Sequence, residues 1–160
     1  MFNIFKRKKE ISIIAPMTGE IIEIDKVPDA VFAGKMVGDG LAINPSEGTV
    51  VAPCNGKIIQ VFPTNHAIGI LTPEGLEILI HIGLDTVNLK GNGFKAFVAA
   101  GDSVKKGDKL LEVDLEYVSN NAKSTISPII ITNIDIVNSI SAKKGTVEKG
   151  KDNIMNIELK

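Results

Sequence analysis

Residues 14–24 read Ile-Ala-Pro-Met-Thr-Gly-Glu-Ile-Ile-Glu-Ile, and residues 51–61 read Val-Ala-Pro-Cys-Asn-Gly-Lys-Ile-Ile-Gln-Val, 37 positions further on. Both copies follow the pattern Ala-Pro-x-x-Gly-x-Ile-Ile-x-(Ile/Val). Proline fixes φ and glycine permits positive φ, so each copy predicts a turn that leads into a half-buried β-strand. A single near-repeat at this spacing indicates a duplicated β-unit rather than a long solenoid.

The rest of the chain is also rich in strand signals. Short aliphatic or β-branched runs are separated by turn-forming Gly, Pro, Asn and Asp, and they lie at Ile43, Val50-Val51, Ile68–Ile70, Leu76–Ile82, Lys109–Val113 and Ile129–Ile131. The segment that starts at Gly101 is partly echoed by the one that starts at Gly145. Helical periodicity is weak, and its best candidate is Leu115–Lys123. We therefore predict an all-β fold: an antiparallel β-sandwich or barrel built on a duplicated motif, with at most short helices.

Composition narrows the class of protein. The chain has 160 residues, a formal net charge of -1 and one cysteine. Near-zero net charge argues against a nucleic-acid partner, and one cysteine excludes a disulfide scaffold or a cysteine-rich zinc module. Nothing in the sequence resembles a low-complexity linker, so one domain is expected.

The N-terminal residues combine apolar and basic side chains in the order Met-Phe-Asn-Ile-Phe-Lys-Arg-Lys-Lys, which is the reverse of a secretory signal. We expect residues 1–12 to be a flexible, solvated tail. A second interpretation is a weak peripheral membrane contact through residues 1–9, with Phe2, Ile4 and Phe5 inserted and the basic residues facing anionic lipid. The sequence has no 18-residue apolar run, and the expected location is cytoplasmic, at most peripheral to the inner face of the membrane.

Candidates for chemistry at neutral pH are few, because the chain has two histidines. His66 and His81 both lie in apolar segments, and His81 interrupts a run that is apolar on both strand faces. Either one could be a structural histidine with a satisfied hydrogen bond. As functional groups, imidazoles suit a metal ligand, a general base or a phosphoryl acceptor. Catalytic zinc needs three protein ligands, and the two histidines supply two of them. Cys54 could add a third, but it is better explained as a small core residue.

Several segments together resemble enzyme IIA of the glucose family of the bacterial phosphoenolpyruvate-dependent sugar phosphotransferase system. The resemblance covers residues 13–160, which we expect to be one EIIA type 1 domain. It rests above all on Leu79–Val87, which is similar to the family's phosphorylation signature, and on Thr64-Asn65-His66-Ala67. Further matching segments are Ile14–Pro16, Val27–Phe32, Val37–Gly40, Asn88–Gly91, Lys123–Pro128 and Thr132-Asn133.

The resemblance implies a role for each matching residue. His81 would accept a phosphoryl group on Nε2, His66 would donate a hydrogen bond to the phosphoryl oxygens, and Thr64 would orient His66. Apart from the resemblance, the charge on a transferred phosphoryl group leads us to expect further donors from backbone N–H groups near Gly83. The remaining positions would form the partner-binding surface, with two acidic residues on its rim and an apolar docking ring: Asp29 and Asp85, then Ala30, Val31, Phe32, Met36, Val37, Phe62, Leu79 and Val87.

The resemblance also implies partners. The chain would take its phosphoryl group from the histidine phosphocarrier protein and pass it to the IIB component of a sugar permease, and it could bind regulatory target proteins. No cofactor is required, although a Zn²⁺ ion could be shared between His66, His81 and a carboxylate of a partner.

Two alternatives from other classes remain at this point. Small β-units with glycine turns are typical of swinging-arm carriers of the biotinyl or lipoyl type, but the lysine setting that such a carrier needs is missing. A zinc peptidase on a related duplicated fold could use His81 and Asp85 as its first ligand pair, but the His-x-His that completes that site is also missing.

Overall fold

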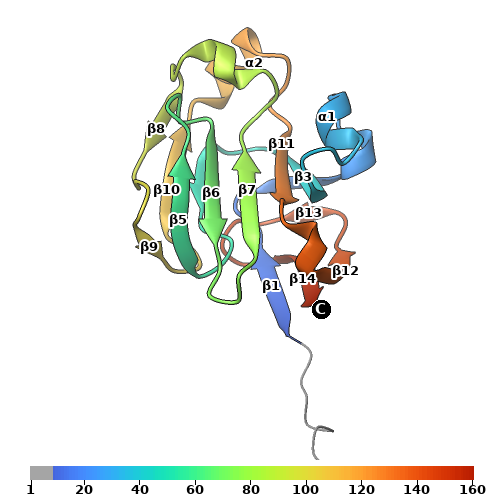
Figure 1. The fold of residues 1–160 in the computed structure, drawn as a ribbon. Helices are drawn as coiled ribbons and strands as arrows, with labels where there is room; N and C mark the ends of the chain where they lie inside the picture. The colour runs from blue at the N-terminus through green and yellow to red at the C-terminus, as the bar shows by residue number, and fades with distance from the viewer. Residues whose placement is uncertain (1–8) are drawn as a thin grey trace, which may run out of the picture.

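The computed structural model describes residues 9–160 (Figure 1). Its strands are β1 (Glu10–Ile14), β2 (Gly19–Glu23), β3 (Asp39–Pro45), β4 (Thr49–Val51), β5 (Gly56–Val61), β6 (Ala67–Leu71), β7 (Glu77–His81), β8 (Phe94–Ala96), β9 (Ser103–Val104), β10 (Lys109–Val113), β11 (Ser127–Ile131), β12 (Val137–Ala142), β13 (Thr146–Val147) and β14 (Asn153–Leu159). The helices are short: α1 (Ala30–Ala33), α2 (Leu115–Asn121) and the 3₁₀ turns η2 (Ile24–Lys26), η3 (Thr86–Leu89) and η4 (Ile134–Ile136).

The strands form an antiparallel β-sandwich, as the sequence predicts. One sheet has eight strands in the order β13-β2-β3-β11-β7-β6-β5-β9, and two three-stranded sheets have the orders β1-β14-β12 and β4-β10-β8. Every strand pairing among the described residues is antiparallel. Alternation along β7 shows how the sheet faces are assigned: Ile78 and Ile80 are buried in the core, whereas Leu79 and His81 lie on the outer face and are half-buried.

A second, smaller apolar cluster covers the outer face of β3 and β11. It contains Ala42 and Ile130 from these strands together with Ile24, Val27, Phe32 and Leu84. Because the neighbouring residues Leu41 and Ile129 face the main core, the central strands are buried on both faces. This cluster packs α1 and η2 against the sheet, close to the C-terminal end of β7 (Figure 1).

The duplicated motif appears in the structure as a near-symmetric pair of turns. The equivalent backbone hydrogen bonds recur in both copies: Ile14 N to Pro53 O (3.0 Å) and Val51 N to Pro16 O (2.9 Å), Ala15 N to Asp152 O and Ala52 N to Asp108 O (both 2.8 Å), and Gly150 N to Ala15 O and Gly107 N to Ala52 O (both 2.9 Å). Likewise β2 pairs with β13 and β5 pairs with β9. The echo between the segments at Gly101 and Gly145 is therefore the second half of the duplicated unit.

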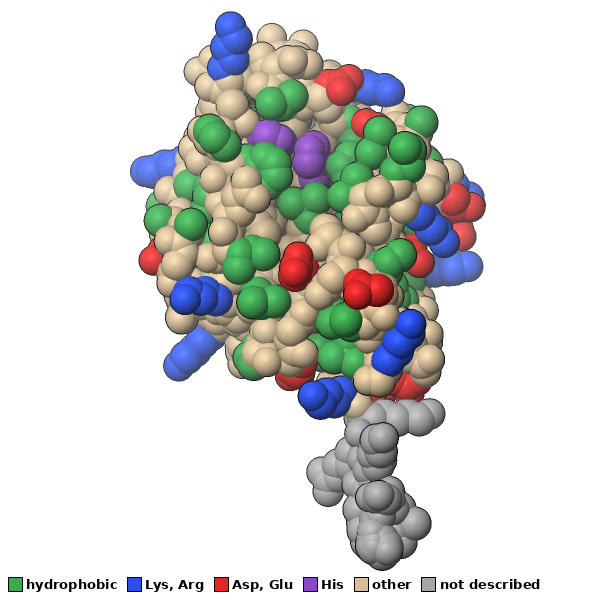
Figure 2. All heavy atoms as spheres, in the orientation of Figure 1, with side chains coloured by type: hydrophobic (Ala, Val, Ile, Leu, Met, Phe, Trp, Pro, Cys, Tyr) green, Lys and Arg blue, Asp and Glu red, His purple; other side chains and the backbone are tan. Residues whose placement is uncertain are grey.

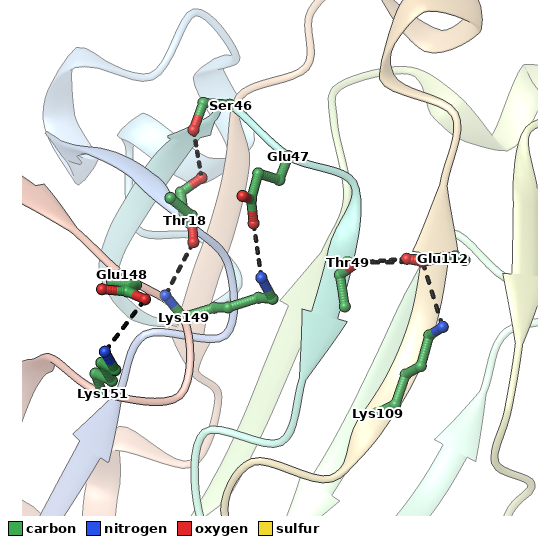
Figure 3. Close-up of polar contacts among 9 residues, drawn as sticks. All are labelled: Thr18, Ser46, Glu47, Thr49, Lys109, Glu112, Glu148, Lys149 and Lys151. Carbon is green, nitrogen blue, oxygen red and sulfur yellow. Dashed lines mark hydrogen bonds and ion pairs between the residues drawn. The ribbon is translucent and has the colours of Figure 1, made fainter.

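Polar contacts join the loops that this duplication brings together (Figure 3). The Lys149 ammonium lies 2.7 Å from a carboxylate oxygen of Glu47, and Lys149 N–H donates to Thr18 Oγ1 at 3.1 Å. Exposed ion pairs of this kind contribute little to stability, since water competes for both partners. Because these ion pairs are exposed, the main source of stability is the burial of the aliphatic core.

Most predicted elements are found, with three differences. The predicted helix at Leu115–Lys123 is α2, which ends at Asn121 and is capped by Asp114, whose carboxylate accepts a hydrogen bond from Tyr117 N–H. The four-residue helix α1 is too short to show periodicity in the sequence. The predicted tail ends too late: β1 begins at Glu10 and pairs with β14, so residues 10–12 belong to a sheet, and residues 1–8 lie outside the described residues.

In the part of the chain that the structure describes, no helix is long and apolar enough to cross a membrane. The predicted contact of residues 1–9 with a membrane lies almost entirely outside the described residues.

Candidate functional site

The hairpin of β6 and β7 brings the two histidines together. His66 immediately precedes β6 and His81 ends β7, and Ala67 pairs with His81 across the ladder. His66 O also accepts a hydrogen bond from Ile82 N–H at 2.8 Å, which closes the end of the hairpin. The two imidazole rings lie edge to face, with centroids 5.0 Å apart and planes at 78°. Figure 2 shows the pair side by side at the surface, with hydrophobic side chains on both sides.

The hydrogen bond of His81 identifies its tautomer. His81 Nδ1 lies 2.9 Å from the carbonyl oxygen of Gly83. A carbonyl oxygen only accepts, so Nδ1 must carry the hydrogen, and in a neutral ring Nε2 then carries the lone pair. Gly83 has φ +71°, and a Cβ there would lie 2.6 Å from Thr86 Cγ2, so the position requires glycine. Local backbone geometry thus leaves Nε2 as the nucleophilic nitrogen.

His66 is the more enclosed member of the pair, with 4% of its surface exposed. Thr64 Oγ1 lies 2.5 Å from His66 Nδ1, and the Phe62 ring packs edge-on against the imidazole with centroids 5.4 Å apart. When the Thr64 hydroxyl donates to Nδ1, the ring hydrogen lies on Nε2. The structure therefore brings together Thr64, His66 and His81, which the sequence resemblance groups.

Burial keeps both imidazoles neutral. It lowers the pKa of His66 to about 4, with a smaller contribution from the neighbouring His81. Burial also lowers the pKa of His81, although the Gly83 carbonyl, Asp29 and Asp85 partly oppose this effect. At pH 7 each ring therefore has one N–H donor and one nitrogen lone pair.

The residues expected to form the docking surface divide into an exposed and a packed group. The exposed fractions of Met36, Val87 and Val31 are 76%, 53% and 44%, so these apolar side chains are open to contact with another molecule. Ala30 is exposed as well, and Val37, Phe62 and Leu79 are half-buried.

Phe32 differs from the other apolar positions in this set. It is only 7% exposed, and its ring centroid lies 5.0 Å from that of His81. It belongs to the outer apolar cluster, so it forms a wall of the histidine site rather than an exposed part of the docking ring.

The two acidic positions lie in elements that border the pair. Asp29 is the N-cap of α1, where its carboxylate accepts a hydrogen bond from Val31 N–H at 2.9 Å. Asp85 is exposed and has φ +59°. Both carboxylates act on the pKa of His81, which places negative charge near the histidine pair.

The expectation of backbone donors near Gly83 fails at Gly83 and at Leu84. The backbone N–H groups at Gly83 and Leu84 are not available to a phosphoryl group, because Gly83 N–H donates to Ser127 Oγ at 3.1 Å and Leu84 N–H donates to Ser124 O at 2.9 Å. The useful backbone group at Gly83 is its carbonyl, and the sequence signal for it is a glycine two positions after the histidine.

Left-handed backbone conformations occur at non-glycine residues in the segments that border the same site. Among the described residues, the non-glycine residues with positive φ are Lys35, Asn65, Asp85 and Lys90. Asn65 adjoins His66, Asp85 adjoins the Gly83 loop, Lys35 follows α1, and Lys90 precedes Gly91, next to the Thr64 backbone. Such conformations are found at functional sites because the surrounding structure must hold them.

The residues offer little to a metal ion. Within residues 9–160, no group of three His, Cys, Asp or Glu side chains is arranged to hold one. Cys54 is 3% exposed, and burial raises the pKa of its thiol to about 12, so it is a core residue, as the sequence indicates. The histidine pair alone supplies two ligands, which is fewer than a zinc site needs.

Fold and site together define the class: an antiparallel β-sandwich that presents two neutral imidazoles at an apolar surface. Comparison with known proteins agrees. Residues 11–137 match the family described as phosphoenolpyruvate-dependent sugar phosphotransferase system, EIIA 1. This chain belongs to that family, and so it is a phosphotransferase-system component of the EIIA type.

Individual relatives are similar over nearly their whole length. The glucose-specific EIIA component of Bacillus anthracis is 50% identical over 161 residues, covering 100% of this chain and 98% of the relative. That of Staphylococcus epidermidis is 53% identical over 152 residues, covering 94% and 92%. Glucose permease IIA from Mycoplasma capricolum matches with a TM-score of 0.89 and 45% identity, covering 98% of this chain and 99% of that chain. Family membership leaves the swinging-arm and zinc-peptidase alternatives without support.

Proposed function

We propose that this protein carries a phosphoryl group on His81 Nε2, accepting it from the histidine phosphocarrier protein and passing it to the IIB component of a sugar permease during uptake. Glucose is the proposed sugar, since the relatives' names specify it. The observation that carries the proposal is the hydrogen bond from His81 Nδ1 to Gly83 O, because it leaves a lone pair on Nε2 of a half-buried ring.

The chemistry follows from that tautomer. The Nε2 lone pair forms the new P–N bond while the donor's P–N bond breaks and its electron pair returns to the donor ring. The hydrogen stays on His81 Nδ1, so the phosphorylated ring carries a positive charge that the Gly83 carbonyl stabilises. On donation the P–N bond breaks, the electron pair returns to Nε2, and a neutral imidazole leaves. Since no protein proton has to move, positioning dominates catalysis.

His66 serves as the neighbouring donor in this scheme. With Nδ1 bonded to Thr64, its Nε2–H can donate to a phosphoryl oxygen, and such a charge-assisted bond is commonly worth about 1.5–3 kcal/mol. Its depressed pKa keeps it neutral, so it holds the dianion without an ion pair that would retard release.

The surface around the pair suits transient partners. Exposed Val31, Met36 and Val87 supply apolar contact that excludes water and slows hydrolysis. The carboxylates of Asp29 and Asp85 favour a partner with basic residues around its own site. Regulatory targets could dock on the same surface at the cytoplasmic face of the membrane, and their binding would depend on whether His81 is phosphorylated.

Zinc enters the proposal only with such a partner. Two neutral imidazoles in contact are suitable Zn²⁺ ligands, and a carboxylate from a partner would be required to complete the site. The ion would then fasten the two proteins together.

The test uses phosphoenolpyruvate, enzyme I and the histidine phosphocarrier protein, with mass spectrometry of the intact chain. We expect one phosphoryl adduct that is acid-labile and base-stable, and its loss in His81→Gln. In His66→Gln we expect acceptance to persist and donation to the IIB component to slow. An adduct that survives in His81→Gln, or an unmodified wild-type chain, would overturn the proposal.

A further inference from the structure

Hydrogen bonds hold the backbone of three consecutive residues after His81, namely Ile82, Gly83 and Leu84. Thr86 Oγ1 donates to Ile82 O at 2.6 Å, Gly83 N–H donates to Ser127 Oγ at 3.1 Å, and Leu84 N–H donates to Ser124 O at 2.9 Å. Thr86 and Ser127 are both fully buried. The carbonyl that remains for His81 is that of Gly83, at 2.9 Å from Nδ1.

Ser127 accepts a hydrogen bond from Gly83 N–H just beyond the end of the ladder between β7 and β11. It is the first residue of β11, and the β7–β11 ladder ends at the pair Ile80–Ile129. Beyond that pair the chain turns away at Gly83, so its N–H meets the Ser127 side chain instead of a strand carbonyl. The same hydroxyl donates to Thr125 O at 2.9 Å. Its hydrogen is therefore committed to Thr125, and its lone pair accepts from Gly83.

Gly83 needs such a restraint more than any other residue of the loop. A glycine at φ +71° has neighbouring conformations of similar energy, and a rotation of its ψ would turn its carbonyl away from the imidazole. Without that acceptor, no hydrogen-bond partner of His81 among residues 9–160 selects the hydrogen on Nδ1 over Nε2. A ring with its hydrogen on Nε2 has no lone pair there to attack phosphorus.

We propose that Ser127 is a positioning residue for phosphoryl transfer: its hydroxyl holds Gly83 in the orientation that keeps the His81 hydrogen on Nδ1 and the lone pair on Nε2. The inference rests on the proposed function, since it assigns Ser127 to the reaction at His81. Ser127 itself is fully buried and acts through Gly83. It controls both halves of the cycle, because the same carbonyl stabilises the charged ring after the P–N bond forms.

The same hairpin contains a matched control. Thr72 is also buried, at 3% exposure, and its Oγ1 accepts a hydrogen bond from Leu76 N–H at 3.0 Å in the turn at the opposite end of β6 and β7. Ser127→Ala and Thr72→Val each remove one buried hydroxyl that accepts from a backbone N–H. A purely structural role predicts similar results for both variants.

The experiment measures the His81 tautomer by ¹⁵N NMR of the unphosphorylated chain at pH 7.5, together with the rate of phosphoryl acceptance from the histidine phosphocarrier protein. In wild type and Thr72→Val we expect Nδ1 to resonate as protonated and Nε2 as unprotonated. In Ser127→Ala we expect the Nε2 resonance to move toward the protonated position, and acceptance to slow roughly ten- to hundredfold. Ser127→Thr, which retains a hydroxyl, should restore both properties.

Wild-type tautomer and rate in folded Ser127→Ala would overturn the proposal, as would an equal tautomer change in Thr72→Val. If Ser127→Ala does not fold, Ser127→Cys replaces the oxygen with a weaker acceptor of similar shape, and an unchanged tautomer in that variant overturns the proposal equally. Failure of the proposed function is distinguishable: the wild-type chain would then take no phosphoryl group, whereas the tautomer measurement requires no phosphoryl donor.

Discussion

Replacement of His66 by glutamine should remove a large part of the acid sensitivity of folding. Burial lowers the pKa of His66 to about 4, whereas the unfolded chain should titrate near the ordinary value of 6.5. Between these two pKa values, His66 is protonated in the unfolded state and neutral in the folded state. The stabilising effect is therefore fully present above pH 6.5 and is lost as the pH falls toward 4.

The magnitude follows from the two pKa values. A difference of about 2.5 corresponds to about 3 kcal/mol when the whole range is crossed, at 1.36 kcal/mol for each pH unit. Between pH 7 and pH 5 the expected loss from His66 is about 2 kcal/mol. With a urea dependence of about 2 kcal/mol per molar, the midpoint should move about 1 M further in wild type than in His66→Gln.

The assay is equilibrium urea unfolding of both proteins at pH 7 and pH 5, followed by far-UV circular dichroism. His81 also has a lowered pKa, but it is present in both proteins, so its contribution cancels except for the coupling through which it lowers the pKa of His66. The absolute stability of His66→Gln is immaterial, because only the change with pH enters. If both midpoints move by the same amount, His66 is not held neutral by burial, and the argument for it as a neutral donor fails.

Three further predictions test other parts of the site. Gly83→Ala should destabilise the fold by more than about 2 kcal/mol and slow phosphoryl acceptance, because its Cβ would meet Thr86 Cγ2 at 2.6 Å; a wild-type melting temperature would contradict this. Val87→Asp should leave stability within about 0.5 kcal/mol but raise KM for the phosphoryl donor protein, since Val87 is 53% exposed; an unchanged KM would remove it from the docking surface. Cys54 should resist a thiol reagent in the native protein and react once urea unfolds it, because burial raises its pKa to about 12; rapid native labelling would refute its placement in the core.

Sequence patterns reveal those parts of the fold in which one local rule dominates. The Ala-Pro-x-x-Gly repeat shows the duplicated unit because turn chemistry requires the same residues in both copies. By contrast β12 is mostly exposed at the edge of its sheet, so its sequence Val-Asn-Ser-Ile-Ser-Ala shows no clear alternation. Helix α1 has four residues, and its one local signal is the capping Asp29.

Part of the site was predictable because a local sequence signal marks it. His81 interrupts an apolar strand, which marks it without any knowledge of its neighbours. The count of two histidines also marked His66, the family resemblance supplied Thr64, and the structure shows the contact between them. The resemblance could not reveal that Phe32 is buried, because that depends on how α1 packs against β3 and β11. Nor could it show that Gly83 N–H is already bonded, because the acceptor lies 44 residues away in sequence.

Ser127 shows most clearly why such a residue is missed. A serine before Pro128 is an ordinary turn signal in sequence, yet here it begins a buried strand. Of the buried polar side chains among the described residues, His66, Thr86 and Ser127 all serve the histidine site, and Thr72 alone lies elsewhere. Burying a polar group costs free energy unless the group is hydrogen-bonded, so each of these side chains needs a partner inside the aliphatic core. The concentration of such groups beside His81 therefore indicates that the geometry there matters. A carrier that must fit at least two partners can vary its exposed rim, but the nitrogen that holds the phosphoryl group has to keep one orientation. The buried hydroxyls of Ser127, at the start of β11, and Thr86, in η3, lie beneath the docking surface and separate these two requirements.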